Sequence, residues 1–208
     1  MFMKKITETF GTNEPIFTQE LLLLFKDTSR AQVFRLIDSA KEKGELIQYA
    51  KGIYSVPQKT RLGNITISSD DVIQKRYLKN EGEVYGVYGG IKLLNAFSVT
   101  TQMAATVEII TNNESSRCRE IQLGNRCYIL RKSRCEIDKS NAAAYTVMQL
   151  FSDMKKGDSL DELSIQKLRE YIRKNGITQS QLFSMAQVFP ARSTKMMIGS
   201  GIINGVIQ

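Results

Sequence analysis

The first part of the chain carries apolar residues at helical spacing. Phe2, Ile6 and Phe10 recur every four residues, and Gly11 follows as a residue able to end a helix. Thr18 stands directly before the apolar segment QELLLLF, where its hydroxyl is suited to act as a helix N-cap. The pattern therefore predicts two successive helices at the start of the chain.

A third helix is predicted from Ser29, which has capping-box spacing to Gln32. The apolar residues that cluster on one side of its helical wheel are Val33, Leu36, Ile37 and Ala40. Gly44 is suited to the position after the last helical residue. Arg30, Gln32 and Arg35 fall away from the apolar side, so we expect this helix to expose them.

After Gly44 the period of the pattern changes to two. The segments LIQY and IYSV are rich in β-branched and aromatic residues, which favours strands. Residues 50–52 lie between them as a short loop, in which Gly52 can adopt a positive φ. Three helices followed by a hairpin predict a winged helix-turn-helix domain over residues 1–57.

The remainder of the chain predicts a second domain, so the whole protein is expected to be α+β. Residues 58–67 are polar and without periodicity, which predicts a linker. Residues 68–138 mix a capped helix, a Gly-Gly turn and the strand-like segments ATVEIIT, EIQLG and RCYILRK. Residues 139–208 have a mainly helical pattern. The second domain, residues 68–208, is thus a mixed α/β part with a helical tail.

Composition narrows the class of protein. The 208 residues are 42% hydrophobic and 24% charged, which is typical of a soluble globular chain. The longest apolar run, residues 21–25, is too short to span a bilayer, and MFMKK lacks the apolar stretch of a secretory signal. We therefore expect a cytoplasmic protein that has no membrane partner.

The chain contains no histidine and three cysteines, Cys118, Cys127 and Cys135. A tetrahedral zinc site needs about four sulfur or nitrogen ligands. We therefore expect no metal and no other cofactor, and interpret the cysteines as reduced structural thiols. The lack of histidine also excludes Ser-His-Asp and Cys-His catalysis.

The net charge of +8 favours a polyanionic partner, because a basic protein gains free energy by releasing counterions from nucleic acid. Arginine can bond guanine through two hydrogen bonds, glutamine can do the same with adenine, and a hairpin tip can contact phosphates. The residues predicted to bind double-stranded DNA are Ser29, Arg30, Gln32, Arg35, Tyr49 and Lys51. The alternatives are that these residues form only a solvated face, or that the winged domain is an adaptor that binds protein.

An active nucleotidyltransferase is a further alternative, because VYGGIKLLNAF is followed by a strand. Enzymes of that class place a GG or GS turn before a strand with two acids, which hold the metal ions. Here Glu108 is the only acid in ATVEIIT, and Ile110 stands where the second acid belongs. One carboxylate cannot build a two-metal site, so we expect the protein not to be an enzyme.

A second candidate surface lies between Ser115 and Arg134. Its basic residues are Arg117, Arg119, Arg126, Arg131, Lys132 and Arg134. Glu120 is the single acid among them. On paired strands these residues could form a basic face for nucleic acid or for an acidic partner. Alternatively, they keep an exposed sheet soluble and discourage pairing at its edge.

The segment IFTQELLLLF…SRAQVFRLIDSAKEKGELIQYAKGIYSVP is similar to the winged head of the AbiEi-type antitoxins of type IV toxin–antitoxin systems, which act in abortive infection. The segment VYGVYGGIKLLNAFSVTTQMAATVEIITNNES resembles the start of their C-terminal antitoxin domain. The chain departs from that pattern at residues 95–97, where Gly-Leu is common, and at Met103, where proline is usual. The resemblance extends from residue 1 to about residue 135.

This resemblance implies a transcriptional autorepressor. Antitoxins of this family bind inverted repeats in the promoter of their own two-gene operon. They also counteract a nucleotidyltransferase toxin encoded next to them, through the C-terminal domain and typically without a stable complex. The resemblance thus implies a functional partner for the second domain, which the residues by themselves do not identify.

Overall fold

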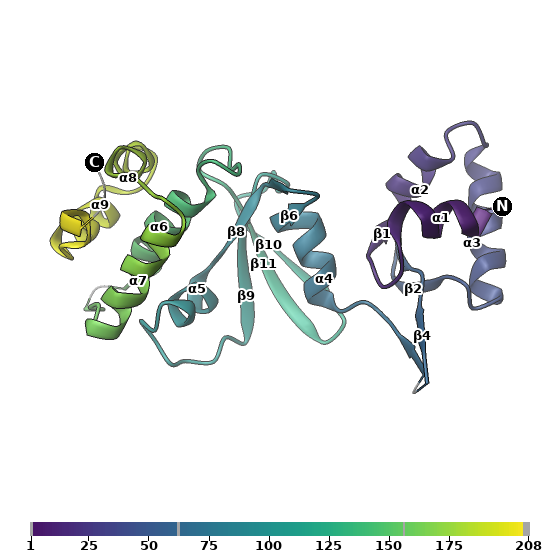
Figure 1. Ribbon diagram of the computed structural model, residues 1–208, viewed down its shortest axis with the longest axis horizontal. Helices are drawn as coiled ribbons and strands as arrows, with labels where there is room; N and C mark the ends of the chain where they lie inside the picture. Colours follow the sequence, from purple (N-terminus) through teal and green to yellow (C-terminus); the bar gives the residue numbers. More distant parts are fainter. Residues whose placement is uncertain (1, 62, 156, 206–208) are drawn as a thin grey trace. The chain divides into compact units, whose positions relative to one another are not determined.

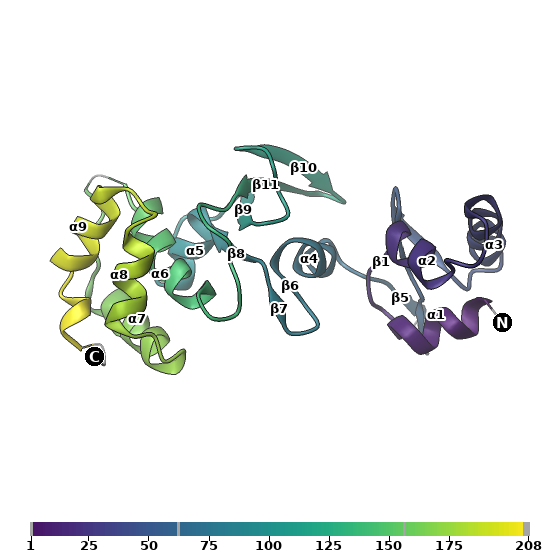
Figure 2. The same ribbon diagram turned by 90° about the horizontal axis from the view of Figure 1, so that it is seen from above.

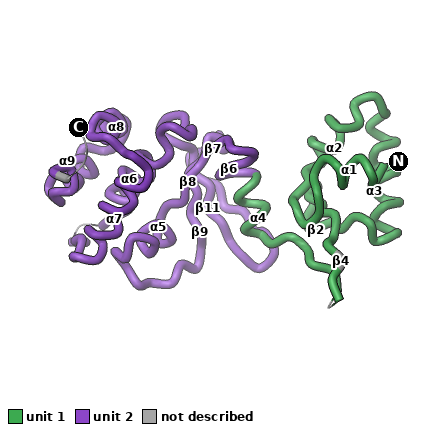
Figure 3. The backbone as a smooth tube through the Cα atoms, viewed as in Figure 1, with its two compact units in different colours: residues 1–75 green, residues 76–208 purple. Residues whose placement is uncertain are grey.

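The computed structural model describes residues 2–61, 63–155 and 157–205, and it confirms the α+β class. The chain separates into two compact units, residues 1–75 (unit 1) and residues 76–208 (unit 2), shown in Figure 3. The boundary falls after Lys75, later than the segment 58–67 that the sequence predicts as a linker. Lys75 is the last residue of unit 1, and its ammonium group donates to the Pro15 carbonyl oxygen of that unit at 2.6 Å.

Unit 1 packs helices against a small sheet. The elements are α1 (Phe2–Phe10), β1 (Ile16–Phe17), α2 (Thr18–Leu24), α3 (Arg30–Glu42), β2 (Ile47–Ala50) and β3 (Ile53–Ser55). Figure 1 labels the three helices, β1 and β2. The strand order is β1-β3-β2, with antiparallel neighbours. The core includes Ile6, Ile16, Leu21, Val33, Ile37 and Ala40. Leu36, which the sequence also predicts to face the core, is half-buried.

Both ends of α3 lie where the sequence places them. Ser29 Oγ accepts a hydrogen bond from the Gln32 N–H at 3.3 Å, which caps the first turn. Gly44 has a φ of 66°, the left-handed conformation common directly after a helix. Local signals are therefore sufficient to delimit this helix.

The start of α2 differs from the prediction. Phe17 is the N-cap residue, and its N–H donates to the Glu20 carboxylate at 2.7 Å. Thr18 is already helical, and its hydroxyl donates to the Gly52 carbonyl oxygen at 3.3 Å. The prediction of Thr18 as N-cap is wrong because its hydroxyl bonds to the β2–β3 turn instead of to its own helix.

The segment predicted as a linker contains a hairpin. Strand β4 (Gln58–Thr60) pairs antiparallel with β5 (Gly63–Ile65). The Thr60 hydroxyl donates to the Gly63 carbonyl oxygen at 2.7 Å across the turn. Such short strands with exposed side chains show no alternation of apolar and polar positions, so the pattern of the sequence does not reveal them.

Helix α4 (Ser69–Ile73) follows the hairpin and has the cap that its sequence suggests. Ser68 Oγ accepts from the Asp71 N–H at 3.2 Å, and the Asp71 carboxylate accepts from the Ser68 N–H at 2.7 Å. The helix then widens into a π-helical turn, Gln74–Leu78. The boundary between the two units lies within this turn.

A mixed sheet lies at the centre of unit 2. Its strands are β8 (Gly86–Gly89), β9 (Thr106–Thr111), β10 (Arg119–Leu123) and β11 (Arg126–Lys132), in the order β10-β11-β9-β8. Strands β9 and β11 run parallel, and the other neighbours run antiparallel. Helix α5 (Gly90–Ala96) follows β8 directly, and β6 (Lys79–Asn80) pairs with β7 (Glu83–Val84) in a separate hairpin.

The C-terminal part of unit 2 is helical. It comprises α6 (Ala142–Asp153), α7 (Glu162–Lys174), α8 (Gln179–Ala186), α9 (Ala191–Gly199) and a 3₁₀ turn at Ile202–Gly205. Helix α6 is central because it contacts β8, α5, α7, α8 and α9 (Figures 1 and 2). Its Tyr145, Met148 and Phe151 side chains are buried. Every helix in the described ranges is too short or too polar to traverse a lipid bilayer.

Candidate nucleic-acid interface

The outer face of α3 presents the side chains predicted to contact bases. Val33 and Ile37 are 0% and 1% exposed, so they fix the rotation of the helix against the core of unit 1. Arg30, Gln32 and Arg35 are all exposed. The N-terminal half of α3 therefore directs its cationic and amide groups to solvent, as the helical period predicts.

Arg30 has an aromatic neighbour on the same helix. Its guanidinium carbon lies 5.7 Å from the centroid of the Phe34 ring, within the range of a cation–π contact. Phe34 is itself half-buried against the core of unit 1. This contact restricts the conformations open to the Arg30 side chain on the outer face of α3. Ser29, by contrast, uses its hydroxyl as the helix cap.

The β2–β3 turn carries Lys51 at an exposed position. Gly52 follows with a φ of 75°, and a Cβ atom there would lie 3.1 Å from Thr18 Oγ1. The Gly52 carbonyl oxygen accepts hydrogen bonds from the Thr18 N–H at 3.0 Å and from its hydroxyl at 3.3 Å. The turn is thus tied to the start of α2, and Lys51 projects from an anchored support.

Tyr49 lies at an irregularity of β2. Gln48 pairs with Tyr54 and Ala50 pairs with Ile53, so the register shifts at Tyr49. Irregularities of this kind re-aim side chains away from the regular alternation of a strand. Tyr49 is half-buried. It lies next to the turn that carries Lys51, with part of its side chain covered.

Lys75 forms its contacts within unit 1, and the sequence pattern does not predict these contacts. Its Nζ lies 2.6 Å from the Pro15 carbonyl oxygen and 2.9 Å from the Glu20 carboxylate. It also lies 5.3 Å from the centroid of the Phe10 ring and 5.7 Å from that of Phe17. Its side chain is 13% exposed, so this lysine stabilises the fold and is not a surface cation.

The second basic surface is divided between two faces of the sheet. Side chains alternate along a strand, so Arg126 and Lys132 share one face of β11 while Arg131 lies on the other. The register of β10 against β11 places Arg119 on the face of Arg126 and Lys132. The remaining two, Arg117 and Arg134, lie outside the strands. The six residues therefore do not form one face of the sheet.

Arg119 and Arg131 of that surface are paired with acids. The Arg119 Nε donates to the Glu114 carboxylate at 2.7 Å, and the Arg131 Nε donates to the Glu108 carboxylate at 2.8 Å. The Glu114 side chain is only 3% exposed, so the first pair also satisfies a buried charge. The sequence places only Glu120 among these cations, whereas the fold adds two further acids.

The Gly-Gly turn between β8 and α5 is enclosed by two carboxylates. Gly90 has a φ of 60°, and a Cβ atom there would lie 2.9 Å from the Glu108 carboxyl carbon. The Gly90 N–H donates to Asp153 Oδ2 at 2.7 Å, and Gln149 donates to Asp153 Oδ1 at 2.7 Å. Burial raises the pKa of Asp153 to about 6 in spite of these hydrogen bonds. Asp153 is the residue of this cluster that the sequence pattern does not connect with the turn.

This cluster differs from a strand with two acids. Ile110 is 3% exposed and belongs to the core of unit 2. Glu108 is bonded to Arg131, and Asp153 is bonded to the Gly90 N–H. Across residues 2–61, 63–155 and 157–205, no group of three or more His, Cys, Asp or Glu side chains is placed to hold a metal ion. Asp153 thus holds the turn through the Gly90 N–H, and Glu108 pairs with the Arg131 guanidinium.

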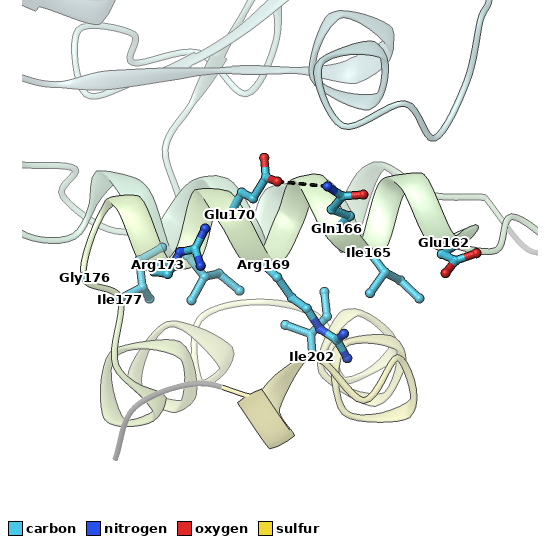
Figure 4. A pocket seen from close by; sticks show the side chains of 10 residues that line it. Glu162, Ile165, Gln166, Arg169, Glu170, Arg173, Gly176, Ile177 and Ile202 are labelled. Atoms are coloured by element: carbon cyan, nitrogen blue, oxygen red, sulfur yellow. Dashed lines mark hydrogen bonds between the residues drawn. The ribbon is translucent and has the colours of Figure 1, made fainter.

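A cavity of about 820 Å³ runs along α7 (Figure 4). Its lining includes Ile165, Ile172, Ile177 and Ile202 together with Glu162, Gln166, Arg169, Glu170 and Arg173. Figure 4 shows the hydrogen bond from Gln166 to Glu170, at 3.1 Å, between two of the polar residues. The residues predicted to bind DNA all lie in unit 1, so this cavity is a separate feature.

Comparison with known proteins gives a family but no activity. Residues 16–180 match the model of DUF6088, which is described as a family of unknown function. No curated protein matches the chain.

Proposed function

The chain belongs to the DUF6088 family, and we propose that it is a DNA-binding autorepressor with a winged helix-turn-helix head. In this proposal α3 enters the major groove and the β2–β3 turn contacts the phosphate backbone beside it. The order of α1, α2, α3 and the β2–β3 hairpin in unit 1 supports such a head. Its target is the promoter of its own operon, at inverted repeats, as the resemblance to AbiEi-type antitoxins suggests.

The observation that carries this proposal is the exposed face of α3. Groove-reading helices present the residues of their N-terminal half to base edges, and here these residues are Arg30, Gln32 and Arg35. Arginine and glutamine are side chains that discriminate guanine and adenine through paired hydrogen bonds. The opposite side of the helix is buried at Val33 and Ile37, so this face is held outward by the core.

A reporter gene fused to the DNA upstream of the protein's own gene tests the repressor. Co-expressed parent protein should lower the reporter signal, and the Arg35→Ala variant should restore it. Arg169→Ala, which removes the same charge from an exposed position on α7, is the matched control and should still repress. Equal repression by all three proteins would reject base readout by α3.

We further propose that unit 2 counteracts a nucleotidyltransferase toxin encoded by the neighbouring gene, without a stable complex. The support is the resemblance of the segment from VYGVYGG to TNNES to the antitoxin domain. Co-expression of the full chain should restore the growth of cells that express the toxin. The Arg35→Ala variant should rescue equally well, because it alters unit 1 alone. Failure of the parent protein to rescue would remove the antitoxin half of the proposal.

The second candidate is an adaptor whose head binds protein. Leu23 on α2 is 75% exposed, and an exposed leucine favours an apolar partner surface. A single exposed apolar side chain is common on folded proteins, however. The cations of α3 therefore favour DNA, and the adaptor becomes the better account only if the reporter does not respond.

A further inference from the structure

We propose that the β4–β5 hairpin is a second DNA-contacting element, a β-ribbon that binds the duplex beside the site read by α3. This inference rests on the proposed function of unit 1. The hairpin lies in the segment that the pattern of the sequence predicts as a linker. The proposal also predicts that the protein covers more DNA than α3 and the β2–β3 turn can reach.

The hairpin stands out from the rest of unit 1. Figures 1 and 3 show it projecting away from the helices of that unit. Those of its residues whose side chains are described are exposed, and they are Gln58, Thr60, Arg61, Gly63, Asn64 and Ile65. A two-stranded hairpin is at best marginally stable by itself in water. An element of this kind, formed but uncovered, is suited to gain its packing from a partner.

The charge of this segment favours a polyanionic partner. Residues 46–69 contain no aspartate and no glutamate, whereas Lys51, Lys59 and Arg61 supply cations. Acids return directly on either side, at Glu45 and Asp70. The cationic segment thus includes both the β2–β3 turn and the β4–β5 hairpin, which favours one continuous polyanion over two separate ligands.

The form of the hairpin fits a nucleic acid groove. The register pairs Gln58 with Ile65 and Thr60 with Gly63, so these residues share one face of the ribbon. The major groove of B-DNA admits a two-stranded ribbon as well as a helix. The Gln58 amide can donate to and accept from base edges or phosphates. The Thr60 hydroxyl, which already donates to the Gly63 carbonyl oxygen, can still accept. Arg61, in the turn, supplies the charge.

The base of the hairpin is fixed to unit 1. Val56 and Pro57 are both buried, directly before β4. The Val56 carbonyl oxygen accepts a hydrogen bond from the Asn13 N–H at 2.8 Å. The ribbon therefore leaves the core at a defined point, next in the chain to β3. An anchored base lowers the ordering that the ribbon would need on binding a duplex.

The test uses the full chain and duplexes from the DNA upstream of its own gene. Arg61→Ala should lower the affinity roughly five- to tenfold at about 0.1 M salt, and should reduce the slope of log K against log salt by about 0.9, the value of one phosphate contact. Arg61→Lys should keep most of the affinity, because it retains the charge. Arg169→Ala, the same change of net charge in unit 2, should bind like the parent.

Shortening the duplex locates the contact. Removing about one helical turn, about 10 base pairs, from the flank that the hairpin contacts should weaken the parent but not Arg61→Ala. An equal effect of Arg61→Ala on long and short duplexes would overturn the placement beside the α3 site. If Arg61→Ala binds like the parent while Arg35→Ala does not, the ribbon proposal fails and the proposed function stands. If the parent binds no duplex, both fail.

Discussion

At the scale of single residues, Arg35 carries the most direct prediction. It is exposed on α3, opposite the buried stripe that includes Val33 and Ile37. Arg35→Ala should weaken binding to upstream DNA by about 1–3 kcal/mol and should weaken binding to random DNA much less. Binding isotherms on both duplexes, with circular dichroism as the control for folding, measure this. Equal losses on the two duplexes would assign Arg35 to the phosphate backbone instead of to bases.

Lys51 is expected to behave in the opposite way. Its side chain is exposed on a turn that hydrogen bonds to Thr18 hold in place. Lys51→Ala should lower the affinity for upstream and random duplexes by a similar factor and reduce the salt slope by about one contact. Titrations over a series of salt concentrations measure both quantities. A loss confined to the upstream duplex would contradict a backbone role.

Asp153 makes the stability of unit 2 depend on pH. Its folded pKa of about 6 lies above the ordinary 3.8, because burial disfavours the charged carboxylate. The stabilisation linked to its proton is complete below about pH 3.8 and is lost as the pH rises through 6. The groups that face it are Gln149, the Gly90 N–H, Glu108 and Arg131. The parent should therefore lose up to roughly 3 kcal/mol from this residue between those limits.

Asp153→Asn removes that titration. The difference in free energy of unfolding between parent and variant should change with pH between about 4 and 7, as urea titrations followed by circular dichroism measure it. Asp27→Asn, the same change at an exposed position of unit 1, is the matched control with which Asp153→Asn is compared. A difference between parent and Asp153→Asn that is constant across this range would refute the assignment.

At the scale of elements, a helix or strand boundary is predictable from the sequence when the residues that determine it lie close together in the chain. Helix α3 is delimited by Ser29 and Gly44, whose effects act within one turn, so both ends are predicted. Thr18 is misassigned because its hydroxyl bonds to Gly52, 34 residues away. The β4–β5 hairpin is missed because its short strands carry no apolar face. Sequence patterns predict an interaction correctly when both residues lie within a few positions of each other. They fail when a distant segment of the chain supplies the second residue.

The features of the candidate site are likewise predictable only where they depend on residues close together in the sequence. The helical period predicts which residues α3 exposes, and Gly52 predicts the turn that carries Lys51. Asp153 could not be placed beside Gly90, because only the packing of α6 against β8 brings it there. The six basic residues between 115 and 134 appear continuous in the sequence. Because side chains alternate between the two faces of β11, Arg131 lies on the opposite face from Arg126 and Lys132.

The Gly-Gly turn gives a prediction with a matched control. Gly90 and Gly176 both have a φ of 60°, but only Gly90 has atoms that would crowd an added Cβ, those of the Glu108 side chain. Gly176→Ala should cost roughly 1–2 kcal/mol for the left-handed backbone. Gly90→Ala should cost roughly 1–3 kcal/mol more, because it also displaces Glu108. Equal changes in urea unfolding would show that the contact with Glu108 is not tight.

At the scale of the whole molecule, the two units have distinct chemistry. Unit 1 holds α3, the β2–β3 turn and the β4–β5 hairpin, with the acid-free segment 46–69. Unit 2 holds a sheet whose Arg119 and Arg131 are paired with acids, and a cavity along α7. The proposal therefore assigns DNA to unit 1 and the toxin to unit 2, so variants in one unit should leave the other function intact.

The central claim is that unit 1 reads a particular DNA sequence. The most direct measurement is an anisotropy titration of the full chain with labelled upstream DNA and with a scrambled duplex of the same composition, over a series of salt concentrations. We predict that log K falls linearly with log salt for both duplexes, and that the upstream duplex binds roughly a hundredfold or more tighter near physiological salt. Equal affinity for the two duplexes at every salt concentration would contradict the account.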